Sequence, residues 1–340
     1  QAEAYFLKVK DLEAEASIEI PSYLLFGLGS TYMRLAEYPK SIDYLEKGIK
    51  DHRFGGNIDE YKEVYVPLAL SYFYSEDYNN SLRVIRDLSG LVSKNMQRQN
   101  VSVMPVVNNF NQEAFSLHVA IALHPEQDGD RVPLIDEAFK TAQLGQSTNA
   151  ANATAQMAAR FASESDAIGQ LIRRQQDLIV QYKKANDMLI QSVDPNFKDT
   201  PNNNPASLKD DVDAIEATLN LFNLELLKAF PRYADLVENQ PLSLSELQDL
   251  LISDEGLFTL IYNEETKSYY TFFVGKNAVK SYRINITKEK LTSIVAQLRS
   301  DIDLSNSFGF GDLPNFDIDL SHDLYSKLFG PVEDMLEGIK

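Results

Sequence analysis

The chain has 340 residues, of which 44% are hydrophobic and 24% charged, a composition typical of a folded protein with room for more than one domain. Fifty acidic residues against 32 basic ones give a net charge of −18. We therefore expect no nucleic-acid partner, because the acidic chain would repel a phosphate backbone. The sequence has no cysteine, which excludes disulfides, thiolate metal ligands and a cysteine nucleophile within these residues.

No apolar run reaches the roughly 20 residues that a membrane-spanning helix needs, and no signal peptide is recognisable at the N-terminus. We therefore expect a soluble protein without a membrane span. The four histidines, His52, His118, His124 and His322, lack the spacing of paired metal ligands. Each is expected at the surface or at the edge of the core, and neither a metal nor a cofactor is expected.

Two segments match position by position at an offset of 40 residues, starting at Ser22 and Lys62. The matched pairs are Leu25 and Tyr65, Leu28 and Leu68, Gly29 and Ala69, Tyr32 and Tyr72, Tyr38 and Tyr78, Ser41 and Ser81, Leu45 and Ile85, and Gly48 and Leu88. Each segment has the spacing of two amphipathic helices. The pattern resembles the tetratricopeptide repeat (TPR), with a longer loop between the copies at 54–59. A degenerate third pair of helices is predicted over 110–123 and 132–145, and Ala2 and Phe6 fit the second helix of an earlier repeat.

In repeats of this kind the first helix of each pair lines a concave groove. The residues predicted to line it here are Tyr23, Phe26, Met33, Arg34, Val66, Leu70, Phe73 and Tyr74. We predict that a protein or peptide partner binds in this groove. The alternative is that Phe26, Leu70 and Phe73 pack against a neighbouring helix, because exposed apolar patches are rare on monomers.

A long helical hairpin is predicted over 138–230. Apolar residues at helical spacing run to Val193, and three prolines and three consecutive asparagines then break the pattern. From Leu208 to Ala229 apolar residues recur every three or four positions, as in a coiled-coil seam, with Ser207 placed to cap the helix.

The last third predicts an antiparallel meander with strands at 256–262, 269–274 and 278–285. Helices are expected on both sides of it: one with a capping box formed by Ser243 and Glu246, one capped by Thr287, and a last one from His322 to Leu336. The acidic stretch 301–319 lacks calcium-loop spacing and is expected to be a solvated loop. The predicted fold class is therefore mostly α with a small α+β part.

Seven short blocks follow one another between residues 138 and 340. They are AFKTAQ at 138–143, QMAARF at 156–161, RQQDL at 174–178, AFPRYADL at 229–236, PLS at 241–243, SDEGL at 253–257 and LYSKLFGPVE at 324–333. Together with the repeats they resemble the CHAT family, caspase-like peptidases of bacteria that place TPR repeats ahead of a clan CD cysteine-protease domain. The resemblance implies TPR-like repeats over 1–137 and the N-terminal part of a CHAT domain over 138–340.

The resemblance also implies a His/Cys dyad, which in the family lies downstream of the LYSKLFGPVE helix. No histidine of this chain matches the catalytic one and no cysteine is present, so we expect no peptide cleavage by the chain itself. The implied role is regulatory and partner-binding, with the downstream catalytic half or an oligomer partner covering an edge of the sheet. The alternative is a non-enzymatic TPR adaptor with a CHAT-like platform. The implied location is the bacterial cytoplasm, or outside it after loss of a leading segment.

Overall fold

The computed structural model describes residues 21–51, 58–102, 109–127, 130–146, 166–193, 204–229, 241–302 and 316–339. Within these residues the chain is mostly helical with one small three-stranded antiparallel sheet, which confirms the coarse fold class. The chain divides into two compact units. The first contains the described parts of Gln1–Ser89, Asn109–Gln146 and Pro241–Lys340, and the second those of Gly90–Asn108 and Ser147–Gln240.

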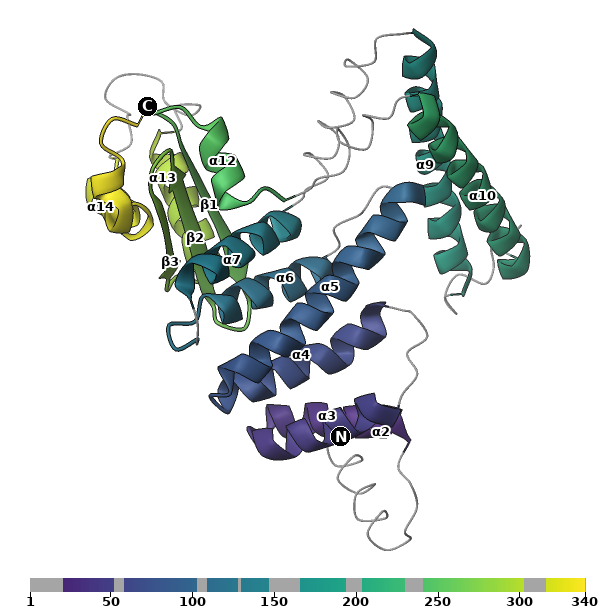
Figure 1. Ribbon diagram of the computed structural model, residues 1–340, viewed down its shortest axis with the longest axis horizontal. Helices are drawn as coiled ribbons and strands as arrows, with labels where there is room; N and C mark the ends of the chain where they lie inside the picture. Colours follow the sequence, from purple (N-terminus) through teal and green to yellow (C-terminus); the bar gives the residue numbers. More distant parts are fainter. Residues whose placement is uncertain are drawn as a thin grey trace, which may run out of the picture. The chain divides into compact units, whose positions relative to one another are not determined.

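Paired helices form the described residues from Ser22 to Gln146 (Figure 1), all within the first unit except the part of α5 after Ser89. They are α2 (Ser22–Arg34) with α3 (Tyr38–Asp51), α4 (Ile58–Tyr74) with α5 (Tyr78–Ser102), and α6 (Asn109–Ala122) with α7 (Arg131–Gln146). All three predicted pairs of helices are therefore present, the degenerate third one included. The helix α4 begins at Ile58 rather than at Lys62, so part of the predicted long loop is helical.

The first two pairs share the geometry of the turn between their helices. Ala36 and Glu76 both have a left-handed backbone, with φ of 59° and 63°. The amide of Ala36 donates to the carbonyl of Met33 at 3.0 Å, and the amide of Glu76 donates to that of Phe73 at 3.1 Å. In both turns the next amide reaches back to a tyrosine carbonyl, which completes a Schellman motif. The 40-residue repeat in the sequence is thus also a repeat of backbone geometry.

Small residues allow the paired helices to approach closely. A Cβ atom on Gly29 would overlap the side chain of Leu45, so α2 and α3 leave no room for a larger residue there. At the matched position in the second pair, Ala69 accepts a hydrogen bond from the hydroxyl of Ser81 at 2.8 Å through its carbonyl oxygen. Close contact at this position is therefore common to both pairs.

The predicted meander is confirmed. It consists of β1 (Gly256–Asn263), β2 (Ser268–Gly275) and β3 (Val279–Ile284), paired in the order β1-β2-β3. Leu260 lies opposite Thr271, and Thr271 lies opposite Tyr282. The central strand β2 is buried along its whole length, because helices cover both faces of the sheet.

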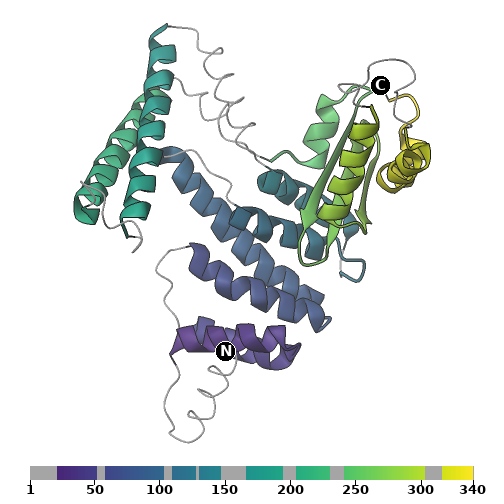
Figure 2. The same ribbon diagram turned by 180° about the vertical axis from the view of Figure 1, so that it is seen from behind.

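One face of the sheet packs on α13 (Lys288–Ile302), which Figure 2 shows lying over the sheet, and on α14 (Ile318–Leu328). The other face packs on the third helical pair, where the rings of Phe139 and Phe272 meet at 5.5 Å. A Cβ on Gly145 of α7 would lie 3.0 Å from the Cδ1 atom of Ile261 in β1. The helices α6 and α7 therefore join the repeats to the sheet within the first unit.

Segments of the chain itself contact the two outer strands. On β3, Lys280 Nζ donates to the carbonyl of Pro331 at 2.5 Å, in the 3-10 helix η3 (Gly330–Met335), and the hydroxyl of Tyr282 donates to the carbonyl of Leu328. On β1, the side-chain amide of Gln146 donates to the carbonyl of Leu260. That another chain covers an edge of the sheet stays a prediction.

The predicted caps are confirmed at two helices. Ser243 and Glu246 form a capping box at the start of α12 (Leu244–Leu250), and Thr287 Oγ1 accepts from the amide of Lys290 at 3.2 Å at the start of α13. The prediction of Ser207 as a cap is wrong: α10 (Pro205–Ala229) begins earlier, and Asn204 Oδ1 accepts from the amide of Ala206 at 3.1 Å.

The last helix also differs from the prediction. The helix α14 begins at Ile318, where Asp317 Oδ1 accepts from the amide of Leu320 at 2.9 Å, and it ends at Leu328. The predicted continuation to Leu336 is η3, with Pro331 in its first turn. A proline cannot donate a helical hydrogen bond and restricts the preceding residue, so the α-helix ends before it.

In the second unit, α9 (Asp166–Val193) and α10 pack side by side, as the hairpin prediction requires. Their contact buries Ile179, Leu208 and Leu219, and the guanidinium of Arg174 lies 4.8 Å from the centre of the Phe222 ring. The predicted start of the hairpin differs, because 138–146 belongs to α7 in the first unit. The expected domain boundary between residues 137 and 138 therefore falls inside a helix.

Some predictions fall outside the described residues. They concern the earlier repeat with Ala2 and Phe6, the block at 156–161, all of the block at 229–236 except Ala229, most of the acidic stretch 301–319, and His52.

Candidate functional site

The eight predicted groove residues lie on α2 and α4, the first helices of the two matched pairs, and they differ in exposure. Tyr23 is 66% exposed and Tyr74 is 42% exposed, and Arg34 is also exposed. Phe26, Met33, Val66 and Phe73 are half-buried, and Leu70 is buried. The accessible part of the predicted groove is therefore narrower than the sequence indicates.

Two of the predicted residues pack inside the chain. Leu70 is 2% exposed, so it belongs to the core and cannot line a binding surface. Phe26 lies against α3, where a Cβ on Gly48 would come within 2.6 Å of its Cε1 atom. For Leu70 the packing alternative is correct, and much of the Phe26 ring is likewise taken up by the paired helix.

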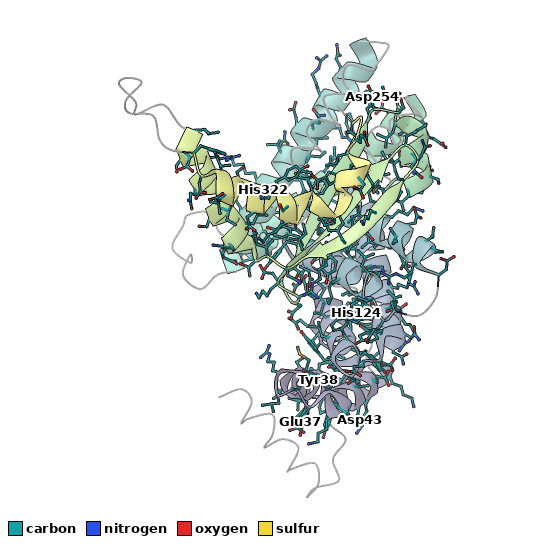
Figure 3. All side chains as sticks on the ribbon, turned by 90° about the vertical axis from the view of Figure 1, so that its left-hand side faces the viewer. Glu37, Tyr38, Asp43, His124, Asp254 and His322 are labelled. Carbon is teal, nitrogen blue, oxygen red and sulfur yellow. The ribbon has the colours of Figure 1, made fainter. Side chains whose placement is uncertain are left out.

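A series of stacked rings connects the helical pairs at their turns, and we call it the ring ladder: Tyr38, Phe73, Tyr74, Tyr78 and His124. Tyr38 stacks on Tyr74 with ring centres 5.3 Å apart, and Tyr78 stacks on His124 at 4.2 Å. Phe73 packs edge-on against Tyr74, Tyr78 and His124. Figure 3 labels Tyr38 and His124, from the first and third pairs.

The ring ladder follows the 40-residue repeat. Tyr38 and Tyr78 are matched residues at the starts of α3 and α5, and each stacks on a ring near the end of the first helix of the following pair. The match between the two tyrosines is visible in the sequence. The contribution of His124 could not be predicted from the sequence, because the third pair of helices does not follow the 40-residue offset.

A buried polar network joins α5, α6 and α7. His118 is 4% exposed, which corrects the expectation of a surface or core-edge position. Its Nε2 lies 2.9 Å from Glu137 Oε1, and its Nδ1 lies 3.0 Å from Ser89 Oγ. Arg86 forms two hydrogen bonds with Glu137, both at 2.6 Å. An ionised carboxylate can only accept hydrogen bonds. His118 Nε2 therefore carries a hydrogen and donates a hydrogen bond to Glu137.

Hydrogen bonds from Arg86 and His118 stabilise the ionised form of Glu137. Burial alone would raise the pKa of Glu137, but the hydrogen bonds from Arg86 and His118 outweigh burial and lower the pKa to about 2. A serine, a histidine and a carboxylate in contact resemble the groups of a hydrolytic triad. Ser89 is only 7% exposed, however, so no substrate reaches its hydroxyl, and the network serves to hold three helices together.

A cavity of about 230 Å³ lies between the α6–α7 turn and the sheet. The turn contributes His124, Pro125 and Arg131, and the strands contribute Tyr270 and Arg283 among others. His124 belongs both to the ring ladder and to this cavity, which we call the arginine cavity. It is a site of concentrated positive charge in an acidic chain.

A wider cavity of about 540 Å³ lies among α3, α4 and α5. Its wall carries basic and acidic side chains in equal number: Lys47, Lys50, Arg83, Asp43, Glu46 and Asp87. Some of these already pair, as Arg83 does with Glu46 at 3.9 Å. This balance of charge selects no class of ligand.

Within the described ranges, no cluster of three or more histidine, aspartate or glutamate side chains is arranged to hold a metal ion. None of the helices in this part of the chain is long and apolar enough to cross a membrane. Comparison with protein-family models, with curated proteins and with solved structures finds no match to this chain.

Proposed function

We propose that this chain is a protein-binding module in which the first helices of the helical repeats hold a peptide partner. The observation that carries the proposal is the repetition of one unit of two helices joined by a turn. In both copies the turn has a left-handed residue at the same position, Ala36 in one and Glu76 in the other. Stacked helical pairs of this kind present extended surfaces, and proteins use such surfaces to bind other proteins.

The accessible surface of α2 and α4 has the composition of a peptide-binding face. It combines the exposed rings of Tyr23 and Tyr74 with the half-buried side chains of Met33 and Val66, and with one exposed arginine, Arg34. Aromatic residues and arginine are enriched among the residues that contribute most to binding energy at protein interfaces. Tyrosine provides apolar contact area and a hydroxyl with little loss of conformational freedom.

We further propose that the module is the regulatory part of a protein of the TPR–CHAT type. The support is the order of elements: repeats, a long helical pair, a capped helix, a three-stranded meander and its flanking helices. The blocks that resemble the CHAT family follow one another along these elements, from AFKTAQ in α7 to LYSKLFGPVE in α14 and η3. A non-enzymatic TPR adaptor with a CHAT-like platform is the alternative.

The gene sequence beyond the codon for Lys340 decides between the two. A histidine and a cysteine on strands that continue the sheet would support a protease. A gene that ends there, or continues without them, would support the adaptor.

Peptide binding can be tested without knowledge of the natural partner. A random-peptide display library is selected on the full chain, and the affinity of an enriched peptide is measured by fluorescence anisotropy. We expect the paired substitutions Tyr23→Ser and Tyr74→Ser to weaken binding by about 10-fold or more. The matched control is Tyr325→Ser on α14, because Tyr325 is 41% exposed and lies outside the repeats. If no peptide is enriched, or if the control weakens binding as much as the pair does, the proposal fails.

A further inference from the structure

The arginine cavity is lined by two arginines that form no ion pair with the described residues. Elsewhere, Arg86 pairs with Glu137 and Arg83 pairs with Glu46. Within the part of the chain that the structure describes, neither Arg131 nor Arg283 has a carboxylate within 4.0 Å. In a chain with a net charge of −18, two such guanidinium groups on one cavity are a local reversal of charge.

Both guanidinium groups are held in place by neutral acceptors. Arg131 Nη1 donates to the carbonyl of His124 at 2.8 Å, at the end of α6. Arg283 Nε donates to Ser268 Oγ at 2.9 Å, and its Nη2 donates to the carbonyl of Thr266 at 3.1 Å. These bonds orient the side chains without neutralising them, and each group keeps further N–H donors. Fixed arginine donors suit the planar geometry of a carboxylate or the oxygens of a phosphate.

The remaining wall of the cavity adds a hydroxyl and apolar surface. Ser281 lines the cavity, and within the described residues its hydroxyl has no hydrogen-bond partner. Pro125 and Leu123 provide apolar contacts. A volume of about 230 Å³ is below the roughly 300–1,000 Å³ of pockets that enclose a drug-sized ligand, so the cavity suits one anionic group with a few carbon atoms.

We propose that the arginine cavity binds an oxyanion, a carboxylate or a phosphate, between the guanidinium groups of Arg131 and Arg283. The anion is either free or carried on an acidic residue of a peptide, and the two sources share this chemistry. The site adjoins the α2 and α4 surface of the proposed function where His124 packs against Phe73. Each can still be tested by itself, because the anion titration uses no peptide selected on that surface.

His124 provides a readout of binding. Its ring is in contact with Tyr78, and Glu126, Arg131 and Arg283 are the charged groups near it. Burial lowers the pKa of His124. The positive charges of Arg283 and Arg131 lower this pKa further, and the negative charge of Glu126 raises it. A bound anion favours the protonated imidazole, so it should raise the pKa of His124. The coupling is reciprocal, and the anion should therefore bind more tightly at low pH.

The test is a histidine-detected NMR titration of the full chain at constant ionic strength. The pKa of His124 is measured in chloride and then with inorganic phosphate, with acetate, and with a short peptide that ends in glutamate. We expect at least one of the three to raise the pKa of His124 by about 0.5 to 1. His322 on α14, also labelled in Figure 3, is the internal control and should not change.

Substitution localises the effect. Arg283→Gln should abolish the rise in the pKa of His124, whereas Arg299→Gln, the same charge change at an exposed position on α13, should leave it intact. A response to phosphate or acetate alone identifies a free anion, and a response to the peptide alone identifies an acidic partner. The proposal is overturned if none of the three anions moves the pKa of His124, or if Arg283→Gln and Arg299→Gln behave alike. Binding of a selected peptide to α2 and α4 should be unchanged in Arg283→Gln.

Discussion

Ala36 and Glu76 lie at equivalent positions of two turns, 40 residues apart, and both have a left-handed backbone. A residue with a Cβ atom is strained in this conformation by roughly 1–2 kcal/mol, whereas glycine adopts it freely. The two turns therefore retain a non-glycine residue at a cost in stability.

Glycine at either position should stabilise the chain. We expect Glu76→Gly to raise the free energy of unfolding by about 0.5 kcal/mol, since the relief of strain exceeds the greater freedom of glycine in the unfolded chain. The same change at Glu63, exposed in the middle of α4, should lower the free energy of unfolding by about 1 kcal/mol. Urea denaturation measures both. Equal losses at the two positions would contradict the left-handed turn.

Two helical glycines should respond in opposite ways to alanine. Gly29→Ala should lower the free energy of unfolding by about 1–3 kcal/mol, because the new Cβ overlaps Leu45. Gly90→Ala should raise the free energy of unfolding by about 0.5–1 kcal/mol, because among the described residues an added Cβ at Gly90 meets no atom within 4 Å outside the nearby backbone of its own helix. Thermal melts followed by circular dichroism test both variants. A stabilising Gly29→Ala would show that α2 and α3 are less closely packed than described.

Much of this arrangement could be predicted from the sequence. The spacing of Tyr38 and Tyr78 marked the repeat, and the Ser243 and Glu246 pair marked a helix start, because both depend on local chemistry. The burial of Leu70 could not be predicted in the same way. Its position on a first helix suits a groove equally well, and only the packing of the whole unit decides its exposure.

The arginine cavity also could not be predicted from local sequence patterns. Arg131 and Arg283 are 152 residues apart in the sequence, and only the packing of the sheet on α6 and α7 brings them to one cavity. The contact of His118 with Glu137 could not be predicted either, because the two residues lie on different helices and no spacing in the sequence indicates that they meet. Tertiary packing determined these sites.

Glu137 should make the stability of the chain depend on pH in the acidic range. Its pKa falls from 4.5 to about 2 on folding, so its contribution is complete above pH 4.5 and is lost as the pH falls from 4.5 toward 2. We expect Glu137→Gln to lower the free energy of unfolding by about 2 kcal/mol at pH 7, allowing for its partial exposure to solvent. The difference from the unsubstituted chain should shrink toward pH 2.

Glu63→Gln, at an exposed position of α4, serves as the control for Glu137→Gln and should change stability little at any pH. Denaturant titrations at several pH values provide the comparison. A loss at Glu137 that is the same at pH 2 and pH 7 would show that the carboxylate is not held by Arg86 and His118.

The two neighbouring aromatic residues at the end of α4 should separate stability from binding. Phe73 packs edge-on against three rings of the ring ladder, so Phe73→Ser should lower the free energy of unfolding by about 3 kcal/mol. Tyr74 is 42% exposed. Tyr74→Ser should lower the free energy of unfolding by about 1 kcal/mol or less, and it should weaken the binding of a selected peptide. Chemical denaturation and anisotropy on both variants test this. A Tyr74→Ser variant as unstable as Phe73→Ser would assign both rings to the core.

Hydrogen exchange on the full chain, with and without a peptide from the display selection, tests the central claim that the first helices of the repeats are the binding surface. We expect the bound peptide to slow amide exchange in α2 and α4, from Ser22 to Arg34 and from Ile58 to Tyr74, and to leave α13 unchanged. Protection confined to the sheet and α13, with none in α2 and α4, would contradict the claim.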